Sequence, residues 1–170
     1  MDINNKIDII NDEHMNAVKE RIKDHEGRKN IVYKDSEGHL TVGIGYKIPR
    51  NSPLKEHDYV NDAFVDSKFE ETFMEAAKGA KRLLKDATIR PEAFGVLTEM
   101  VFQMGEQGVS KFPTMLKHLR AGDTTKAANE MLKGSKEGTP SKWSLQTPNR
   151  AMALYNIMVN LKGDNNGMME

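Results

Sequence analysis

Residues 26–45, EGRKNIVYKDSEGHLTVGIG, decide the fold. Within this stretch a short apolar run, Ile31–Tyr33, is followed by the turn-rich segment Asp35–Gly38. From Leu40 to Tyr46 apolar residues occupy every second position, which is the alternation of a strand with one buried face. Two strand patterns on either side of a turn predict a β-hairpin or a small meander.

A helix is expected immediately before the hairpin. Apolar residues within 15–22 recur at intervals of three and four, which is the spacing of one apolar helix face. Asn11 or Asp12 can cap the start of this helix, and Gly27 offers a left-handed stop. Glu26 is therefore predicted to lie in the last turn of the helix.

Most of the chain after the hairpin carries helical patterns. A polar loop, Ser135–Gln146, is expected before the last helix. The sequence thus favours an α+β fold that is mostly helical, with a small antiparallel sheet near the start. The predicted helices are Phe69–Asp86, Pro91–Gly105, Thr114–Arg120, Thr124–Leu132 and a helix that begins at Pro148.

The composition excludes several classes of protein. The chain has 170 residues and no Cys, which rules out disulfides, thiol nucleophiles and Cys-ligated zinc. Its 25 Lys and Arg balance 25 Asp and Glu, so the chain lacks the excess of basic residues that a nucleic-acid-binding protein normally has. No apolar run approaches the roughly 20 residues that span a bilayer, and Met1–Lys6 lacks the features of a secretory signal. We expect a protein made in the cytosol, without an integral membrane segment.

No cofactor or metal site is expected. Gly43–Gly45 begins like a dinucleotide-binding fingerprint, but a third glycine at the required spacing and a following helix are missing. The five His are scattered along the sequence, and no pair of them has the spacing of metal ligands on one helix.

Three side chains of different character fall within the opening stretch: Glu26 at a helix end, Asp35 in a turn and Thr41 on a strand. Local structure alone explains each of them. The negative end of the helix dipole disfavours the ionised form of Glu26, and burial is expected to add to this effect, whereas turn N–H groups should keep Asp35 ionised. One protonated and one charged carboxyl is the division of roles that glycoside hydrolysis requires.

The same residues resemble the active-site stretch of the T-even phage lysozyme family. Glu26, Asp35 and Thr41 are separated by nine and then six residues, which is the spacing of that family. Two further segments match it in the expected order, Met100–Glu106 and Gln146–Ala151.

The resemblance covers roughly residues 15–162 and implies a fold. A single lysozyme-like domain, residues 1–170, would contain two lobes. The lobe with the hairpin would span about 15–68, a connecting helix about 69–86, and a helical lobe about 87–163. A substrate groove is expected between the lobes, where small-molecule sites often lie.

The resemblance also implies an activity, that of a muramidase that hydrolyses the β-1,4 bond between N-acetylmuramic acid and N-acetylglucosamine in bacterial peptidoglycan. Glu26 would be the general acid, Asp35 the base or electrostatic partner, and Thr41 would help to hold the attacking water. Phe102 and Gln103 would contact substrate, the first as an apolar wall and the second through its amide. An inverting mechanism is expected, with the two carboxyls about 6.5 to 9.5 Å apart.

Some positions support this assignment and others depart from the family. Glu37, Trp143 and Arg150 match positions that support the cleft from the carboxyl-terminal lobe. Tyr46 stands where the family often has His, so an ion pair anchored on that His is absent, and the loop Gly134–Lys142 is longer than expected. Family members are often basic, whereas this chain has zero formal charge. Binding to the wall is therefore expected to depend more on groove contacts than on long-range attraction.

Two alternative activities remain open on the same fold: a lytic transglycosylase and a non-catalytic peptidoglycan-binding module. Asp35 and Thr41, which can serve an incoming water, favour hydrolysis. As an endolysin the protein would wait in the host cytoplasm until a separate membrane-permeabilising protein, such as a holin, gives access to the periplasm or cell wall. A role in virion entry is also open, although the compact length favours lysis. We expect a monomer.

Overall fold

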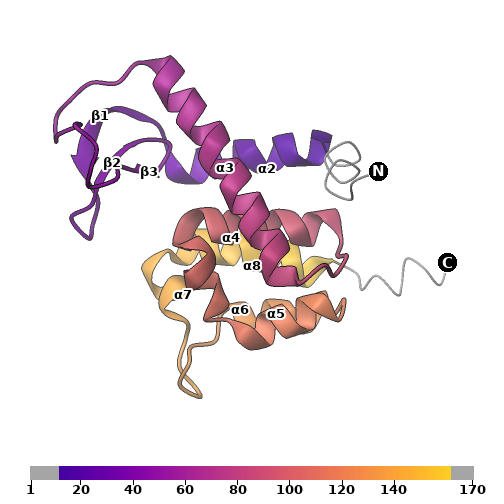
Figure 1. Ribbon diagram of the computed structural model, residues 1–170. Coiled ribbons are helices and arrows are strands. Elements are labelled where there is room, and N and C mark those ends of the chain that lie inside the picture. The colour runs from indigo at the N-terminus through magenta and orange to yellow at the C-terminus, as the bar shows by residue number, and fades with distance from the viewer. Residues whose placement is uncertain (1–11, 162–170) are drawn as a thin grey trace. The chain divides into compact units, whose positions relative to one another are not determined.

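The computed structural model describes residues 12–161 (Figure 1). The predicted mostly helical α+β class is confirmed, because helices dominate these residues and a three-stranded antiparallel sheet lies near the start. None of the helices in this range is long and apolar enough to cross a membrane. The predicted cap at Asn11 and the ends of the predicted domain lie outside the described residues. The helices are α2 (Asp12–Glu26), α3 (Asp62–Leu84), α4 (Pro91–Ser110), α5 (Pro113–Arg120), α6 (Thr124–Met131), α7 (Lys142–Gln146) and α8 (Pro148–Asn160), and the strands are β1 (Lys29–Lys34), β2 (Leu40–Gly43) and β3 (Tyr46–Lys47).

The chain divides into two compact units. The first, Lys19–Glu75, is called the sheet unit here. The second combines Met1–Val18 with Ala76–Glu170 and is called the helical unit. Helices α2 and α3 each contribute residues to both units.

The sheet unit is built on the strand order β1-β2-β3, so the predicted hairpin is confirmed. Tyr33 pairs with Thr41 across β1 and β2, and Thr41 pairs with Lys47 across β2 and β3. The hairpin turn starts at Asp35, whose carbonyl accepts the N–H of Gly38 at 2.9 Å. The core of this unit consists of the buried apolar residues Ile22, Val32, Val42, Ile44, Val60, Val65, Phe69 and Phe73.

The second strand is shorter than the sequence predicts. Strand β2 ends at Gly43, and the chain turns through Ile44–Gly45 before β3. Gly43 has φ +70°, and a Cβ atom on it would lie 3.2 Å from the side chain of Val65. Residues 41–44 are all buried, so the expected alternation is wrong here, and Tyr46 belongs to a separate strand.

Helix α3 begins at Asp62, seven residues before the predicted start at Phe69. Asn61 caps it, because its Oδ1 accepts the N–H of Phe64 at 2.8 Å. Val65 is buried and extends the apolar stripe by one turn toward the N-terminus. The earlier start of α3 was therefore signalled by an Asn cap, which lies before the clearest part of the apolar stripe.

The core of the helical unit consists of apolar side chains of the second part of α3 and of helices α4 to α8. Helix α4 does not end at Gly105 as predicted. Gly105 has φ +80° and ψ 164°, which interrupts the helix, and the chain then resumes helical structure to Ser110. The segment predicted as a polar loop contains α7, whose cap Ser141 accepts the N–H of Ser144 at 3.2 Å through its hydroxyl oxygen.

We expect Arg28→Ala to lower the Tm at pH 7 by about 2 °C or less, because exposed ion pairs contribute little. Arg28 donates to Asp66 at 2.9 Å and to Asp62 at 3.2 Å, and thereby ties the start of β1 to α3. Hydrogen bonds from Asn30 and Arg28 hold the pKa of Asp62 below its ordinary value. The stabilisation is therefore present above about pH 4 and is lost as the pH falls through the lowered pKa. Thermal melts of both proteins between pH 7 and pH 2 check this, and a difference that persists undiminished at pH 2 would contradict it.

Candidate active site

Glu26 lies at the C-terminal end of α2, as the sequence predicts. Gly27 ends the helix with φ +74°, and its N–H donates to the carbonyl of Lys23 at 2.8 Å. The half-buried side chain of Glu26 packs against the backbone of Gly45, where a Cβ atom would lie 2.6 Å from Oε1 of Glu26. Only a glycine at position 45 leaves the carboxyl in this place.

Asp35 is held by the turn that it starts. Its Oδ1 accepts the N–H groups of Glu37 at 2.9 Å and His39 at 2.8 Å, and its Oδ2 lies 3.8 Å from Nζ of Lys47. Burial opposes ionisation of this carboxyl, but the two backbone hydrogen bonds and the nearby Lys47 and His39 together lower its pKa. The direction of this pKa shift agrees with the prediction that Asp35 stays ionised.

Thr41 lies on β2 with only 3% of its surface exposed. Its hydroxyl donates to the carbonyl of His39 at 3.0 Å. The backbone of His39 therefore contacts two predicted site residues, because its N–H binds Asp35 and its carbonyl binds Thr41. Thr41 and Asp35 are fixed relative to one another by a single residue of the loop.

A three-residue segment, Gly45–Lys47, links the two carboxyls. Gly45 lies against Glu26, and the Lys47 ammonium faces Asp35. The sheet unit thus brings the three predicted catalytic residues, Glu26, Asp35 and Thr41, into one neighbourhood.

Tyr33 is a member of this neighbourhood that reasoning from the residues did not single out. Burial raises the pKa of the Tyr33 hydroxyl, and the negative charges of Glu26 and then Asp35 raise it further. Both carboxyls therefore lie within electrostatic range of this one hydroxyl. The Lys29 ammonium lies 4.2 Å from the centre of the Tyr33 ring. The position of Tyr33 in the strand just before Asp35 was the available signal, but a Tyr in a strand is ordinarily a packing residue.

Phe102 and Gln103, the predicted substrate-binding residues, lie on α4 in the helical unit. Phe102 is half-buried and packs against the helical core. The amide of Gln103 donates to the hydroxyl of Thr147 at 3.1 Å and accepts the indole N–H of Trp143 at 2.8 Å. One N–H and one carbonyl lone pair of this amide remain after these two bonds. The Gln103 side chain is therefore fixed by two hydrogen bonds and can form only a few more.

Three further residues were expected to support the cleft. Trp143 is 7% exposed and packs edge-on against Phe112, so it is a packing residue of the helical unit. Arg150 donates through Nε to the fully buried Glu99 at 2.8 Å. Glu37 lies in the hairpin of the sheet unit, so the expectation that it supports the cleft from the carboxyl-terminal lobe is wrong.

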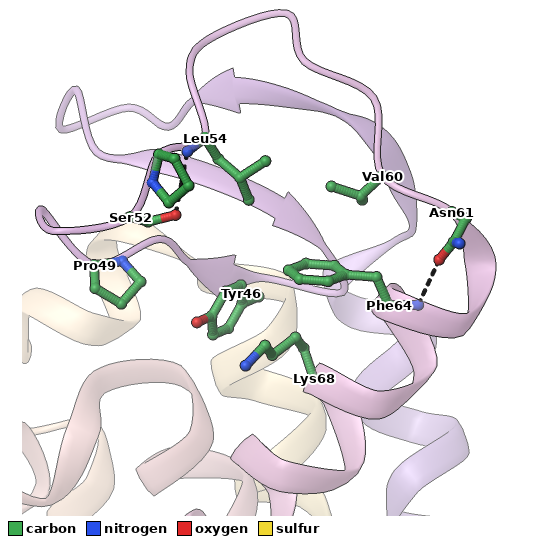
Figure 2. Close-up of a pocket in the computed structure, with 9 residues that line it drawn as sticks. Tyr46, Pro49, Ser52, Leu54, Val60, Asn61, Phe64 and Lys68 are labelled. Atoms are coloured by element: carbon green, nitrogen blue, oxygen red, sulfur yellow. Dashed lines mark hydrogen bonds between the residues drawn. The ribbon is translucent and has the colours of Figure 1, made fainter.

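Tyr46, which replaces the family His, lies at a pocket of about 480 Å³ in the sheet unit (Figure 2). Its ring meets Phe64 edge-on, with the ring centres 6.2 Å apart, and the Lys68 ammonium lies 5.4 Å from the Tyr46 ring centre. Figure 2 shows Leu54 and Val60 on the opposite wall. Tyr46 thus forms aromatic and cation–π contacts, and the ion pair was expected to be absent here.

The described residues contain no group of three or more His, Asp or Glu that could hold a metal ion. The site contains two carboxyls, a hydroxyl on a strand and a half-buried phenol, all from the sheet unit. This set can transfer protons and orient a water.

Comparisons with known proteins indicate the family of the chain. A model of the phage lysozyme family matches residues 23–148. The chain is 27% identical to "Probable T4-type lysozyme 1" of Dictyostelium discoideum, over 85% of this chain and 94% of that protein. It is 31% identical to the "Pre-baseplate central spike protein Gp5" of Enterobacteria phage T4, over 84% of this chain but 28% of that protein, and 29% identical to the "Endolysin" of Bacillus phage B103, over 69% and 43%. Because the family model matches most of the length of the chain, the chain belongs to the phage lysozyme family.

Proposed function

We propose that this protein hydrolyses the β-1,4 bond between N-acetylmuramic acid and N-acetylglucosamine in bacterial peptidoglycan, with Glu26 as general acid, Asp35 as base and Thr41 positioning water. The observation that carries the proposal is the pair of carboxyls flanking Gly45–Lys47, both close enough to raise the pKa of Tyr33.

The reaction needs one proton donor and one proton acceptor on opposite faces of the sugar. Glu26 gives its proton to the glycosidic oxygen as the bond to the anomeric carbon breaks. A water loses its proton to Asp35 as its oxygen bonds to that carbon. The leaving sugar gains the proton from Glu26, and the anomeric configuration inverts. Asp35 suits its role because the turn keeps it ionised.

In this proposal Thr41 holds the water. Its hydroxyl hydrogen is directed at the His39 carbonyl, so the oxygen retains lone pairs that can accept a hydrogen bond from water. A water held in this way has its own lone pairs available for attack. The Tyr33 phenol, whose pKa is raised by burial and by the two carboxylates, stays neutral and adds no third negative charge.

The remaining contacts to substrate are assigned to the helical unit. Phe102 provides an apolar surface for a sugar ring, and the spare N–H of Gln103 serves a sugar oxygen. Because Trp143 and Thr147 hold the Gln103 amide, its orientation is fixed before substrate arrives.

The biological setting is part of the same proposal. A monomeric endolysin collects in the host cytoplasm and reaches the periplasm or cell wall after a holin-type protein opens the membrane. The similarity to the endolysin of Bacillus phage B103 supports this role, whereas the similarity to the central spike protein of Enterobacteria phage T4 makes a role in virion entry the second candidate.

Digestion of purified peptidoglycan, with mass spectrometry of the fragments, tests the proposed reaction. We expect fragments that end in reducing N-acetylmuramic acid and carry the mass of one added water per cut. Fragments with an anhydro ring would replace this proposal with a transglycosylase. Binding without new reducing ends would replace it with a binding module.

We expect Gly45→Ala to lower the rate of wall clearing about 100-fold, because a Cβ atom 2.6 Å from Oε1 of Glu26 must displace the carboxyl. Gly138→Ala is the matched control, since Gly138 also has positive φ (+78°) but has nothing within 4 Å of its Cβ position. Both variants should lose about 1 to 2 kcal/mol of stability from backbone strain. Turbidity assays and urea unfolding of the two variants separate the effects, and equal losses of activity would contradict the role of the Glu26–Gly45 contact.

A further inference from the structure

The two carboxyl oxygens of Asp35 have different surroundings. Oδ1 accepts two backbone N–H groups, from Glu37 at 2.9 Å and from His39 at 2.8 Å. Each oxygen of a carboxylate has two lone pairs, so Oδ1 has none left for a further proton donor. Oδ2 is therefore the oxygen of Asp35 that can accept a proton from a water.

In the described part of the chain, two basic side chains lie near Oδ2 of Asp35. Nζ of Lys47 is 3.8 Å from this oxygen and Nδ1 of His39 is 3.6 Å from it. Both distances are longer than a hydrogen bond. Positive charge at such distances favours the ionised carboxyl but leaves the lone pairs of Oδ2 open to a water.

Lys47 is the more constant of the two sources of positive charge. A Lys side chain is cationic throughout the range in which carboxyls titrate. His39 is charged only when it is protonated, and its Nδ1 also lies 3.7 Å from the carboxyl of Glu37. Acidic groups also lie around Asp35, namely Glu37 in its own turn, Tyr33 on β1 and, within range of the same Tyr33, Glu26 at the end of α2. Their negative charges oppose ionisation of Asp35, so the ammonium of Lys47 offsets them.

Strand β3 directs Lys47 toward Asp35. Side chains alternate along a strand, so Tyr46 lines the pocket of Figure 2 while Lys47 points to the other side of β3. There Lys47 and His39 both line a second cavity of the sheet unit, of about 280 Å³. The Lys47 side chain is 58% exposed, so a shorter polar side chain can replace it without loss of packing.

We propose that Lys47 is a positioning residue of the reaction, which keeps Oδ2 of Asp35 charged and open to the attacking water in mildly acidic solution. The inference rests on the proposed function, because it requires Asp35 to be the base. A charge that stabilises a carboxylate also makes it a weaker base. Lys47 therefore extends the activity to lower pH and does not raise the rate at neutral pH.

The pH dependence of kcat/KM on soluble, peptide-free glycan strands tests the proposal. On the acid limb, where the rate follows the ionised fraction of the base, Lys47→Gln should be roughly two- to fivefold slower than the wild type. Above that limb it should be no slower. The deficit on the acid limb should shrink as salt is added, and Lys47→Arg, which keeps the charge, should restore the wild-type profile.

Lys34→Gln is the matched control. Lys34 lies on β1, is 59% exposed and faces the carboxyl of Glu56 at 3.8 Å, so its exposure and ion-pair distance match those of Lys47. This variant should keep the wild-type profile. A wild-type profile in Lys47→Gln, a loss of the same size at every pH, or an equal loss on the acid limb in Lys34→Gln would each overturn the proposal.

A titration of Asp35 followed by NMR of its carboxyl carbon measures the same effect without catalysis. All proteins carry Glu26→Gln, so that the two carboxyls do not titrate together. The midpoint of Asp35 should be higher with Lys47→Gln than with Lys47 intact, and unchanged with Lys34→Gln. An unchanged midpoint with Lys47→Gln overturns the role of Lys47 whether or not the protein hydrolyses peptidoglycan. A raised midpoint in a protein whose Glu26-containing form gives no hydrolysis products would contradict the proposed function instead, so the two failures are distinguishable.

Discussion

Glu26→Gln is expected to reduce the rate of peptidoglycan hydrolysis about 10²- to 10⁴-fold, which is the usual contribution of a positioned general acid. The change is nearly isosteric, so the amide still fits against Gly45 and the end of α2 is undisturbed. Only the proton that the leaving sugar needs is removed. The decrease in turbidity of a purified wall suspension measures the rate, and circular dichroism checks that the variant is folded.

Glu20→Gln is the matched control for this prediction. Glu20 lies on the same helix but is exposed, and its pair with Lys23 is a surface contact at 3.3 Å. It should keep the wild-type rate. Clearing by folded Glu26→Gln at the rate of Glu20→Gln would remove Glu26 as the acid, whatever the products of the wild-type enzyme.

Glu99→Leu is expected to destabilise the helical unit by about 3 to 5 kcal/mol, because it leaves the Arg150 charge buried without this carboxylate. Glu99 is fully buried and Arg150 is 9% exposed, with Nε and Oε2 2.8 Å apart. Urea unfolding followed by the fluorescence of Trp143, the single Trp of the chain, reports on this unit directly.

Two comparisons distinguish the stability lost by leaving a buried charge unpaired from the stability lost by removing a surface contact. Glu106→Leu breaks an exposed pair with Arg82 at 2.8 Å and should cost about 1 kcal/mol or less. The double variant Glu99→Leu/Arg150→Met should regain part of the stability that Glu99→Leu loses, because no buried charge is left. A loss in Glu99→Leu as small as that in Glu106→Leu would contradict the argument.

Local chemistry made much of the sheet unit predictable. Gly27 ends a helix and Asp35 starts a turn because of their own backbone and side-chain preferences, which act over a few residues. The predicted positions of Glu26 and Asp35 follow from these preferences. The ionised state of Asp35 was predictable for the same reason, since its partners are the N–H groups of its own turn.

Contacts between distant residues were not predictable in this way. No local rule indicates that Gly45 lies against Glu26, or that Tyr33 lies in the field of two carboxyls. The internal bonds of Gln103 join it to residues forty and forty-four positions away. Such contacts depend on tertiary packing, which propensity and periodicity do not encode. Helix α7 was missed for a related reason, since five residues are too few to show a helical period.

The backbone of His39 holds both Asp35 and Thr41, and this limits how the protein can be engineered. An exposed loop tip ordinarily tolerates grafted epitopes or affinity tags. Residues 36–39 look suitable by exposure alone, yet an insertion there would shift the one peptide on which the base and the water-holding hydroxyl both rely.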